Sequence, residues 1–434
     1  MKNNVRIALT KGFSRPVRDP LWGHIYLTPQ LEDVIKSPPF MRLHRILQLG
    51  PVSTVYPGAT HTRAGHSIGV FHLAHRLIQA LAERGADVWL TAVGVRSFLA
   101  ASLLHDIGHF PYTHSLKELP LAAHEELAGK AILVDPLKSL VEKSGADPAM
   151  TAAIVDVNIE TAEEETCFYR KLLSGALDPD KLDYLNRDAR YAGVPYGAQD
   201  VDFILSRLEP HAERGVDIDS KGIPSVESLL FSKYLMYRTV YWHRDVRSAT
   251  CMVKKAIIAG LEKGVIAKEE LYDLDDQGLF ALMSSRSSIL PILSLGEQVR
   301  NGQLYEAIAE FPFDETAHNA SCAELLDINK RSLSEEKLAE KIAEQTETPF
   351  SQDDVIIDVP EAVSFETGLF VRDENRIFSE SSALFKKEMV KTFKRILRTV
   401  RVYVPVFATK KHNFVSSLLQ LNKNLIYSIV QFYC

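Results

Sequence analysis

The strongest chemical signal in the sequence is the run LLHDIGH at residues 103–109. A long apolar stretch precedes it, so a histidine, a carboxylate and a second histidine stand where a purely structural helix would need only a cap. Histidine and aspartate are ligands of borderline and hard divalent ions. A C-terminal cap formed by Asp106 and Gly108 is the structural alternative, and a single His-Asp pair often occurs by chance. His105 and Asp106 are therefore candidate metal ligands that need support from elsewhere in the chain.

Two other segments supply residues of the same types. GATHTRAGHSIGV at residues 58–70 places His66 at the start of a helix, with Arg63 just outside it. LDPDKLDYLNRD at residues 177–188 has Pro179 before Asp180, which is typical of the first turn of a helix. Three separated segments thus give a four-ligand set with open positions for water or phosphate: His66, His105, Asp106 and Asp180. Such a site can activate water for hydrolysis.

The helix that begins near Pro179 has a polar stripe. Helical spacing places four of its residues on one face, namely Asp180, Tyr184, Arg187 and Asp188. These side chains could line a cleft or could be solvated surface. For Asp183 and Arg190 we expect solvated surface.

Further residues near these segments could bind phosphate or move protons. Arg63, Lys181 and Lys233 would supply the positive charge that a polyphosphate requires. The candidates for proton transfer are His109, His114 and the adjacent pair His124 and Glu125. For His109, a role in orienting a ligand or capping a helix is an equal alternative.

The elements that must position these residues are mostly helices. Apolar spacing predicts helices over His66–Arg84, Val88–Leu104, Ala122–Leu133, Thr161–Leu173, Asp180–Tyr191 and Ser225–Leu261. Residues 267–345 carry shorter amphipathic segments, which we interpret as a helical extension. After Pro349, β-branched runs in DDVIIDVP, TGLFVRD and VRVYVPVF predict strands, with a helix over Ser381–Leu397 between them. We expect a mainly α protein with three parts: a core at 1–265, a helical extension at 266–348 and a small α+β unit at 349–434.

Composition excludes several classes of protein. The chain has 434 residues, a net charge of −6 and four widely spaced cysteines, so neither a polycation, a disulfide framework nor a cysteine zinc site is indicated. No apolar run approaches the length of a membrane span and the N-terminus has no apolar signal region, so we expect a cytoplasmic protein. Basic residues nevertheless gather after Glu388, including Lys391, Lys410, Lys411 and Lys423. A solvated helix face is the simpler interpretation of these lysines.

The order of the motifs resembles that of the HD-domain metal-dependent phosphohydrolases, and within them the deoxynucleoside triphosphate triphosphohydrolases. The resemblance extends from about Arg18 to Phe407. It is carried by DPLWGHIYLTP, FMRLHRILQLG, YPGATHTRAGHSIGV, LLHDIGHFPYTH, LDPDKLDYLNRDARYAG, YRTVYWHRDVR, DDVIIDVP and VRVYVP. Fewer than twenty residues precede the match, so we expect no sterile alpha motif domain there. The fold implied is an HD-domain helical core.

The resemblance implies a role for each matched residue. It implies that a catalytic divalent metal, whether Mg, Mn, Fe, Co, Ni or Zn, is held by His66, His105, Asp106 and Asp180. It implies that the phosphates contact Arg63, Lys181 and Tyr184, and Lys233 stands where the family has an arginine. Contacts with the sugar 3′-hydroxyl are implied for Gln48 and Asp188, and exclusion of ribonucleotides for Leu49 and Tyr241. His114 resembles the catalytic acid of the family, and His124 another of its active-site histidines.

Two departures from the family pattern bear on rate and regulation. Lys117, beside Glu118, replaces an aspartate that follows the catalytic acid, which affects the orientation and pKa expected for His114. Lys36, Met41 and His44 replace residues that recognise a guanine activator. Arg15 and Arg401 keep positive charge at positions that resemble the effector site, so the resemblance implies a polyphosphate effector without strict guanine activation. It also implies a dimer or tetramer, with oligomer contacts expected after Phe407.

The motifs and the family resemblance allow three functions. The first is hydrolysis of deoxynucleoside triphosphates to deoxynucleoside and inorganic triphosphate. The second keeps the metal but changes the substrate to a monophosphate, a cyclic nucleotide or a signalling nucleotide. The third is a regulator with weak catalysis that binds nucleotide or single-stranded nucleic acid. The intact ligand set places the third last, and the sugar contacts implied for Gln48, Leu49 and Tyr241 favour the first over the second.

Overall fold

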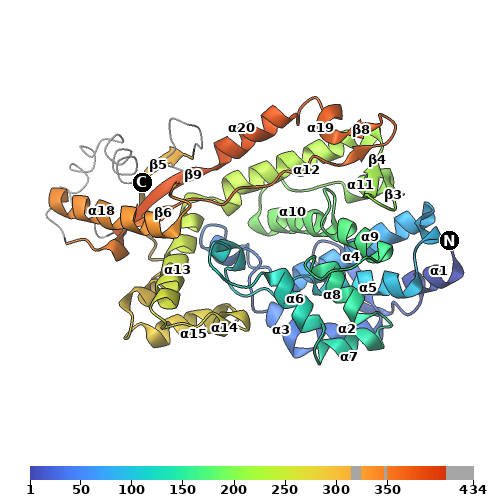
Figure 1. The fold of residues 1–434 in the computed structure, drawn as a ribbon, viewed down its shortest axis with the longest axis horizontal. Coiled ribbons are helices and arrows are strands. Elements are labelled where there is room, and N and C mark those ends of the chain that lie inside the picture. The colour runs from blue at the N-terminus through green and yellow to red at the C-terminus, as the bar shows by residue number, and fades with distance from the viewer. Residues whose placement is uncertain (314–323, 347–348, 407–434) are drawn as a thin grey trace. The chain divides into compact units, whose positions relative to one another are not determined.

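The computed structural model describes residues 1–313, 324–346 and 349–406, and Figure 1 shows its elements. The chain forms two compact units, each assembled from several stretches of sequence. Unit 1 comprises residues 1–236, 268–279 and 365–387, and unit 2 comprises residues 237–267, 280–364 and 388–434. The predicted core at 1–265 therefore contributes to both units. Lys410, Lys411, Lys423 and the oligomer contacts predicted after Phe407 lie outside the described residues.

Unit 1 is built around α4 (Arg63–Glu83) and α5 (Ala92–Leu104), which pack on each other. Nearly the whole of α5 is buried, in agreement with its apolar sequence. α10 (Pro179–Ala192) packs on α4, and α8 (Pro148–Val155) packs on α5. The other helices of this unit are α1 (Asn3–Thr10), α2 (Pro29–Ile35), α3 (Pro38–Leu43), α6 (His124–Ile132), α7 (Leu137–Lys143), α9 (Glu164–Leu173), α11 (Val201–Arg207), α12 (Ile223–Met236), α14 (Glu269–Tyr272) and α19 (Phe378–Ser381).

Three helix predictions need correction. The helix predicted over Ser381–Leu397 begins only at Lys387, and a separate short helix ends at Ser381. The stretch predicted as one helix from Ser225 to Leu261 is interrupted by a π-helical turn at Tyr237–Tyr241, so α12 ends at Met236 and α13 (Arg244–Glu262) begins anew. The His243 side chain caps α13 by accepting from the backbone N–H of Asp245. The helix predicted from Val88 begins only at Ala92, because the hydroxyl of Thr91 accepts the Gly94 N–H and fixes the N-terminus there.

Small sheets complete unit 1. β1 (Arg15–Asp19) and β2 (Gly23–Leu27) form an antiparallel hairpin. β3 (Leu208–His211), β4 (Gly215–Ile218), β7 (Phe370–Val371) and β8 (Arg376–Ile377) form a second sheet in that order. β4 and β7 are parallel, with Ile218 opposite Val371. The return of residues 365–387 to this sheet makes them part of unit 1.

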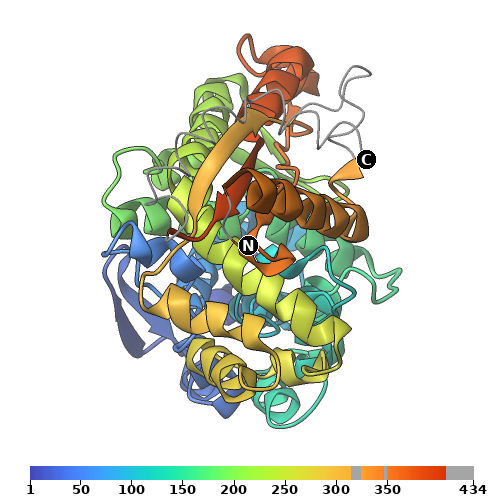
Figure 2. The same cartoon turned by 90° about the vertical axis from the view of Figure 1, so that its left-hand side faces the viewer.

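Unit 2 contains a three-stranded antiparallel sheet in the order β5 (Glu306–Pro312), β9 (Thr399–Val404) and β6 (Ile356–Asp358). One face of the sheet packs its valines against α18 (Ile328–Thr346), which lies across the strands in Figure 2. The other face contacts α13, where Asp358 pairs with Arg247. The unit also holds α16 (Leu295–Arg300) and nearly all of α20 (Lys387–Leu397), while α15 (Asp276–Arg286) begins in unit 1 and ends in unit 2.

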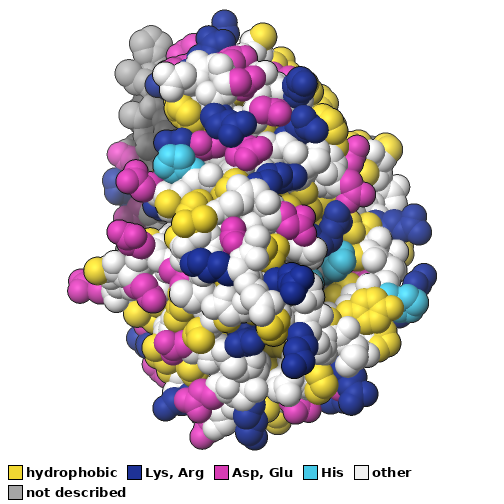
Figure 3. Space-filling model, turned by 90° about the vertical axis from the view of Figure 1, so that its right-hand side faces the viewer, with side chains coloured by type: hydrophobic (Ala, Val, Ile, Leu, Met, Phe, Trp, Pro, Cys, Tyr) yellow, Lys and Arg dark blue, Asp and Glu magenta, His cyan; other side chains and the backbone are white. Residues whose placement is uncertain are grey.

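The predicted mainly α fold with a small α+β part is confirmed. β5, however, lies in the region predicted as a purely helical extension. Pairing with β9 overrides the helical preference of its alanines and glutamates. None of the helices described is long and apolar enough to cross a bilayer. On the face drawn in Figure 3, basic and acidic side chains are interspersed rather than gathered in a single-sign patch.

Candidate metal centre

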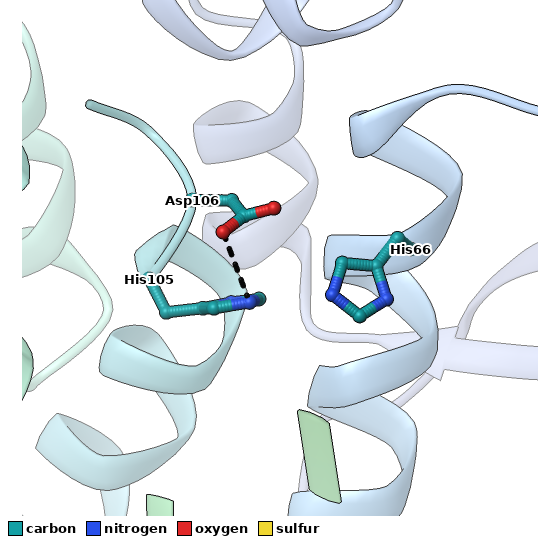
Figure 4. Close-up of side chains that lie close together, drawn as sticks. All are labelled: His66, His105 and Asp106. Carbon is teal, nitrogen blue, oxygen red and sulfur yellow. Dashed lines mark ion pairs between the residues drawn. The ribbon is translucent and has the colours of Figure 1, made fainter. Parts of the chain in front are cut away.

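The ends of three helices of unit 1 bring the four predicted ligands together. His66 lies on the first turn of α4, His105 and Asp106 directly follow α5, and Asp180 lies on the first turn of α10. The ligand atoms of His66, His105 and Asp106 all lie within 4.8 Å of one another (Figure 4). Asp180 Oδ1 lies 3.0 Å from His66 Nε2 and 3.9 Å from His105 Nε2. Asp180 therefore lies beside both histidines of this group.

The hydrogen bonds of the two histidines leave their Nε2 atoms available to a cation. His66 Nδ1 lies 2.9 Å from Asp183 Oδ2, and His105 Nδ1 lies 3.0 Å from the carbonyl oxygen of Ser102. Both partners are acceptors, so each Nδ1 carries a ring hydrogen, and each ring in its neutral form has its lone pair on Nε2. His105 Nε2 is buried and has no hydrogen-bond partner among the described residues. Buried acceptors that face one another require a donor or a cation. The donor set therefore fits a divalent ion.

Electrostatics at this point favour positive charge. Burial lowers the pKa of His66, but hydrogen bonds to Asp180 and Asp183 outweigh it and raise that pKa to about 10. Burial raises the pKa of Asp180, and the hydrogen bond with His66 outweighs it and lowers that pKa to about 2. A divalent cation held by His66 Nε2 would take the position of the proton that these carboxylates attract. Its binding would release that proton.

Asp183 is the residue that orients His66, and the prediction that it lies on the solvated surface is wrong. Its side chain is 0% exposed. Trp22 Nε1 donates to Oδ1 at 2.6 Å, and Arg187 donates to Oδ2 from Nε at 2.7 Å and to Oδ1 from Nη2 at 2.9 Å. Together with His66, four N–H groups converge on one carboxylate. The spacing Asp183-Arg187 is the i, i+4 spacing of a helical ion pair, and this was the available sequence signal.

Asp106 links the candidate ligands to the candidate proton-transfer residues. Arg63 Nη1 donates to Asp106 Oδ2 at 2.7 Å, and Asp106 Oδ1 lies 3.1 Å from His109 Nδ1. His109 Nε2 lies 3.2 Å from His114 Nε2. Burial holds the pKa of His109 well below its usual value, so this ring is neutral. Its two nitrogens thus lie between the Asp106 carboxylate and the exposed His114.

His124 extends this histidine group. Its ring centroid lies 3.8 Å from that of His109, and its Nδ1 lies 3.1 Å from Glu125 Oε2. Burial lowers the pKa of His124 to about 2, which keeps the ring neutral. Atoms of Asp106, His109 and His124 also lie within 4.8 Å of one another. The structure therefore brings together all four residues predicted to transfer protons.

The residues predicted to contact the sugar lie in two places. The Gln48 N–H donates to the carbonyl of His61 at 3.0 Å, and His61 Nε2 lies 2.7 Å from the buried Asp188. Gln48 Oε1 is buried without a hydrogen-bond partner among the described residues, and Leu49 beside it is half-buried. His61 is a link between the two that received no specific role from the sequence. Tyr241 belongs to the π-helical turn of unit 2, where its ring packs edge-on against Tyr237.

The lysines predicted to bind phosphate are paired with acids. Lys181 Nζ donates to Asp178 Oδ2 at 2.6 Å and to the Gly175 carbonyl at 2.9 Å. Lys233 is buried, which lowers its pKa, and its Nζ lies 3.5 Å from Glu366 Oε2. The same Glu366 oxygen lies 3.9 Å from Lys181 Nζ. The sequence gave no sign of Glu366, because it comes from a distant segment of the chain. Tyr184 is half-buried on α10, one turn after Asp180.

The two residues implied for an effector site belong to different units. Arg15 in unit 1 is exposed, and its Nε lies 3.4 Å from Glu32 Oε2. Arg401 in unit 2 is buried on β9, with its Nε 3.5 Å from Glu310 Oε2. Arg401 Nε and Nη1 make no hydrogen bond to the described residues. The effector role of both residues stays a prediction.

Comparisons with known proteins point to one family. A family model described as the HD associated region matches residues 200–424, more than half of this 434-residue chain. An uncharacterized protein of Methanocaldococcus jannaschii is 31% identical over 300 residues, covering 68% of this chain and 60% of that protein. Deoxynucleoside triphosphate triphosphohydrolase SAMHD1 of Xenopus laevis is 32% identical over 205 residues, covering 46% of this chain and 32% of the frog enzyme. The match thus covers 60% of the Methanocaldococcus jannaschii protein and 32% of the frog enzyme.

A solved structure shows the same fold. A phosphohydrolase from Bacteroides thetaiotaomicron matches with a TM-score of 0.68 at 24% identity, covering 90% of this chain and 99% of that one. This likeness concerns the fold alone. The fold alone does not identify the family. The family match does, and it covers the segments that follow the candidate metal centre. The chain belongs to the HD-domain proteins that carry an HD associated region, related to the triphosphohydrolases of the SAMHD1 type, as the sequence motifs indicated.

Proposed function

We propose that this chain is a metal-dependent phosphohydrolase that cleaves deoxynucleoside triphosphates to deoxynucleoside and inorganic triphosphate. The observation that carries the proposal is the convergence of His66, His105, Asp106 and Asp180, with both histidines held in the tautomer that a cation requires. A bound divalent ion supplies a water of lowered pKa and neutralises phosphoryl charge. The relation to SAMHD1, whose name states this substrate class, supports the choice of substrate.

The residues of the chain would then act on the two ends of the scissile bond. Water oxygen bonds to the α-phosphorus, the bond from phosphorus to the 5′-oxygen breaks, and the departing oxygen takes a proton. His114 is the exposed member of the histidine group and is held by His109, which is itself held by Asp106. We assign the proton donation to His114 and an orienting role to His109 and His124. Glu125 would orient His124 in turn.

Substrate recognition would use the residues around Asp188. The buried Gln48 Oε1 and the Asp188 carboxylate are acceptors that suit a sugar hydroxyl donor. Lys181 and Lys233 would exchange Glu366 for phosphate oxygens. Arg63 keeps one nitrogen on Asp106, and its buried Nε is without a partner among the described residues. The roles of Leu49, Tyr184 and Tyr241 remain predictions of the same hypothesis.

The test is product analysis by anion-exchange chromatography. The full chain, loaded with Mn²⁺, Mg²⁺, Fe²⁺, Co²⁺, Ni²⁺ or Zn²⁺, is incubated with each deoxynucleoside triphosphate and each ribonucleoside triphosphate. We expect deoxynucleoside and intact triphosphate, with ribonucleotides spared. His105→Ala and Asp106→Ala should lower the rate by more than the roughly 100-fold that loss of an outer partner costs. His24→Ala, an exposed histidine on β2, is the matched control. Full activity in both ligand variants would refute the proposal.

Hydrolysis of another nucleotide is the second candidate. It is favoured by the engagement of Arg63 with Asp106 and of Lys181 with Asp178, which leaves fewer cationic groups ready for a triphosphate. Adding nucleoside monophosphates and cyclic nucleotides to the substrate panel decides between the two. Release of monophosphate or free phosphate, with no triphosphate, would select this candidate. A nucleic-acid-binding regulator with weak catalysis is the remaining alternative, and a panel without any turnover would select it.

Three further expectations accompany the proposal. We propose that the chain assembles as a dimer or tetramer, works in the cytoplasm and responds to a polyphosphate effector through Arg15 and Arg401. The relation to a dNTP-hydrolysing enzyme supports an effector of the same chemical class as the substrate. A rate that needs a mixture of deoxynucleoside triphosphates, rather than any single one, is the result expected for such an effector.

A further inference from the structure

Unit 1 contains a cavity of about 100 Å³ whose lining includes none of the four candidate metal ligands. It is bounded by α1, the start of α2, the first half of α5 and the segment that follows α7. Ile7, Phe13, Leu31 and Leu99 form an apolar wall. Arg96, Lys11, Thr28 and Ser144 form the polar part. The cavity therefore has an apolar side and a polar side that carries two cations.

Arg96 is the feature that structural needs do not explain. It is the single charged residue of α5, a helix that is otherwise apolar and almost entirely buried. No described residue gives its guanidinium a hydrogen bond or an ion pair, although Arg96 is itself only partly accessible to solvent. Solvent reaches its nitrogen atoms, so the guanidinium is open to the cavity, where a bound anion would pair with it.

The chain makes room for this guanidinium. Gly145 has a φ of +78°, and a Cβ atom placed on it would lie 3.1 Å from Arg96 Cδ and 3.3 Å from Nη1. A larger residue at this position would push the arginine side chain away. The backbone of the loop after α7 therefore packs directly against the arginine, which holds it beside the cavity.

The donors in the cavity match one carboxylate. Lys11 is a second cation, and none of the described residues that line the cavity is acidic. The Thr28 hydroxyl already accepts from the Leu31 N–H, so its hydrogen is free to point to a ligand. The Ser144 hydroxyl is used, because it donates to the Val141 carbonyl. The arginine fork binds a carboxylate through two parallel hydrogen bonds.

We propose that this cavity binds a small carboxylate with a short apolar tail, the carboxylate on Arg96 and Lys11 and the tail against Ile7, Leu31 and Leu99. The apolar wall distinguishes this ligand from inorganic phosphate, which has no apolar part to bury. The proposal is independent of the reaction proposed for the metal centre, and its test measures binding only.

The experiment is ligand-observed saturation-transfer NMR on the full chain at pH 7. The probes are isovalerate, acetate and inorganic phosphate, each titrated separately. We expect isovalerate to bind saturably and acetate at least fivefold more weakly. Arg96→Gln should weaken isovalerate binding about tenfold or more, because it removes a charge-assisted hydrogen-bonding pair. Lys11→Gln, an exposed substitution that spares the fold, should weaken binding several-fold. Lys143→Gln, an exposed neighbour that does not line the cavity, is the matched control and should bind as the parent does.

The outcomes separate the possibilities. Tighter binding of phosphate than of isovalerate would overturn the carboxylate assignment. Equal binding of acetate and isovalerate would overturn the role of the apolar wall. Isovalerate binding that is absent, or unchanged in both Arg96→Gln and Lys11→Gln, would overturn the site itself. If Arg96→Gln fails to fold, the result for Lys11→Gln decides alone.

Discussion

Replacing Asp183 by asparagine tests the inferred support of the metal centre. The carboxylate accepts four N–H groups, two on each oxygen, from Trp22, His66 and Arg187. An asparagine of nearly the same volume has one acceptor oxygen and presents its NH₂ group to the other two donors. Whichever way the amide turns, at least one donor of His66 or Arg187 faces another donor.

The expected cost follows from that mismatch. Breaking a buried ion pair by removing one partner costs about 3–5 kcal/mol. Arg187 keeps a second carboxylate, because its Nη1 donates to Asp19 at 2.9 Å. We therefore expect the lower end, about 3 kcal/mol in the free energy of unfolding. If the amide NH₂ faces His66, the ring must move its hydrogen to Nε2, which removes the lone pair that binds a cation. Metal affinity should then fall by about 10- to 100-fold.

The assay has two readouts and one control. Urea unfolding followed by circular dichroism gives the change in unfolding free energy, and competition with a chromophoric chelator gives the affinity for Zn²⁺ and Mn²⁺. Asp202→Asn is the matched control, because Asp202 is an 82% exposed side chain paired with Arg76. An exposed pair contributes less than about 1 kcal/mol, and this one is outside the metal centre. Equal stability and equal metal affinity of Asp183→Asn and Asp202→Asn would refute the reasoning.

Three other predictions concern side-chain packing inside unit 1 and inside unit 2. Gly69→Ala should destabilise unit 1 by about 3 kcal/mol in urea unfolding, because the new Cβ would lie 2.0 Å from the Asp183 carboxylate that holds His66. Gly368→Ala, with open space around it, should be nearly neutral, and equal effects would contradict the prediction. Burial raises the pKa of Asp276 to about 6, so this residue contributes stability that is present below about pH 4 and is lost as the pH rises through 6. As the pH rises from 5 to 7.5, the free energy of unfolding of Asp276→Asn should therefore increase by about 1 kcal/mol relative to that of the parent. An identical pH profile for the two proteins would contradict the sign. Arg247 binds Asp358 through Nε at 2.9 Å and Nη2 at 2.5 Å, so Arg247→Lys should lower the unfolding free energy of unit 2 by about 2 kcal/mol, and an unchanged urea midpoint would show that the fork geometry is unimportant.

The four candidate ligands could be placed from sequence because each lies at a helix end with a local signature. The apolar run before His105, Pro179 before Asp180 and the glycines around His66 mark those ends without knowledge of the fold. The residues that support the ligands were not predictable in this way. Asp183 meets Trp22 across 161 residues and His66 across 117 residues, so its burial depends on tertiary contacts that spacing along one helix does not encode.

The same distinction applies to the strands. β6 and β9 consist mostly of β-branched residues, so their local preference agrees with their pairing. β5 has the sequence EAIAEFP, in which alanine and glutamate favour a helix, and it becomes a strand because β9 offers it a hydrogen-bonding edge. The helix prediction failed there because the partner strand, β9, lies far from β5 along the sequence.

The balance of charge favours a divalent ion at the candidate centre. A bound cation would replace the proton on His66, so with a cation present the histidines are neutral and the sum depends on the buried acids and arginines. Four carboxylates, those of Asp19, Asp106, Asp180 and Asp183, face two guanidinium groups, those of Arg63 and Arg187. Burial alone would raise the pKa of Asp106, but His109, His105 and Arg63 outweigh it and hold that pKa well below its usual value, so this carboxylate is ionised. The acids therefore exceed the bases by two charges, which one divalent cation offsets and a monovalent cation does not. Because Lys181 and Lys233 already face Asp178 and Glu366, a triphosphate gains a cationic surface only by displacing these acids. In the proposed reaction, binding of a triphosphate would thus depend on the acids that hold these two lysines, and the sequence offered no sign of Glu366.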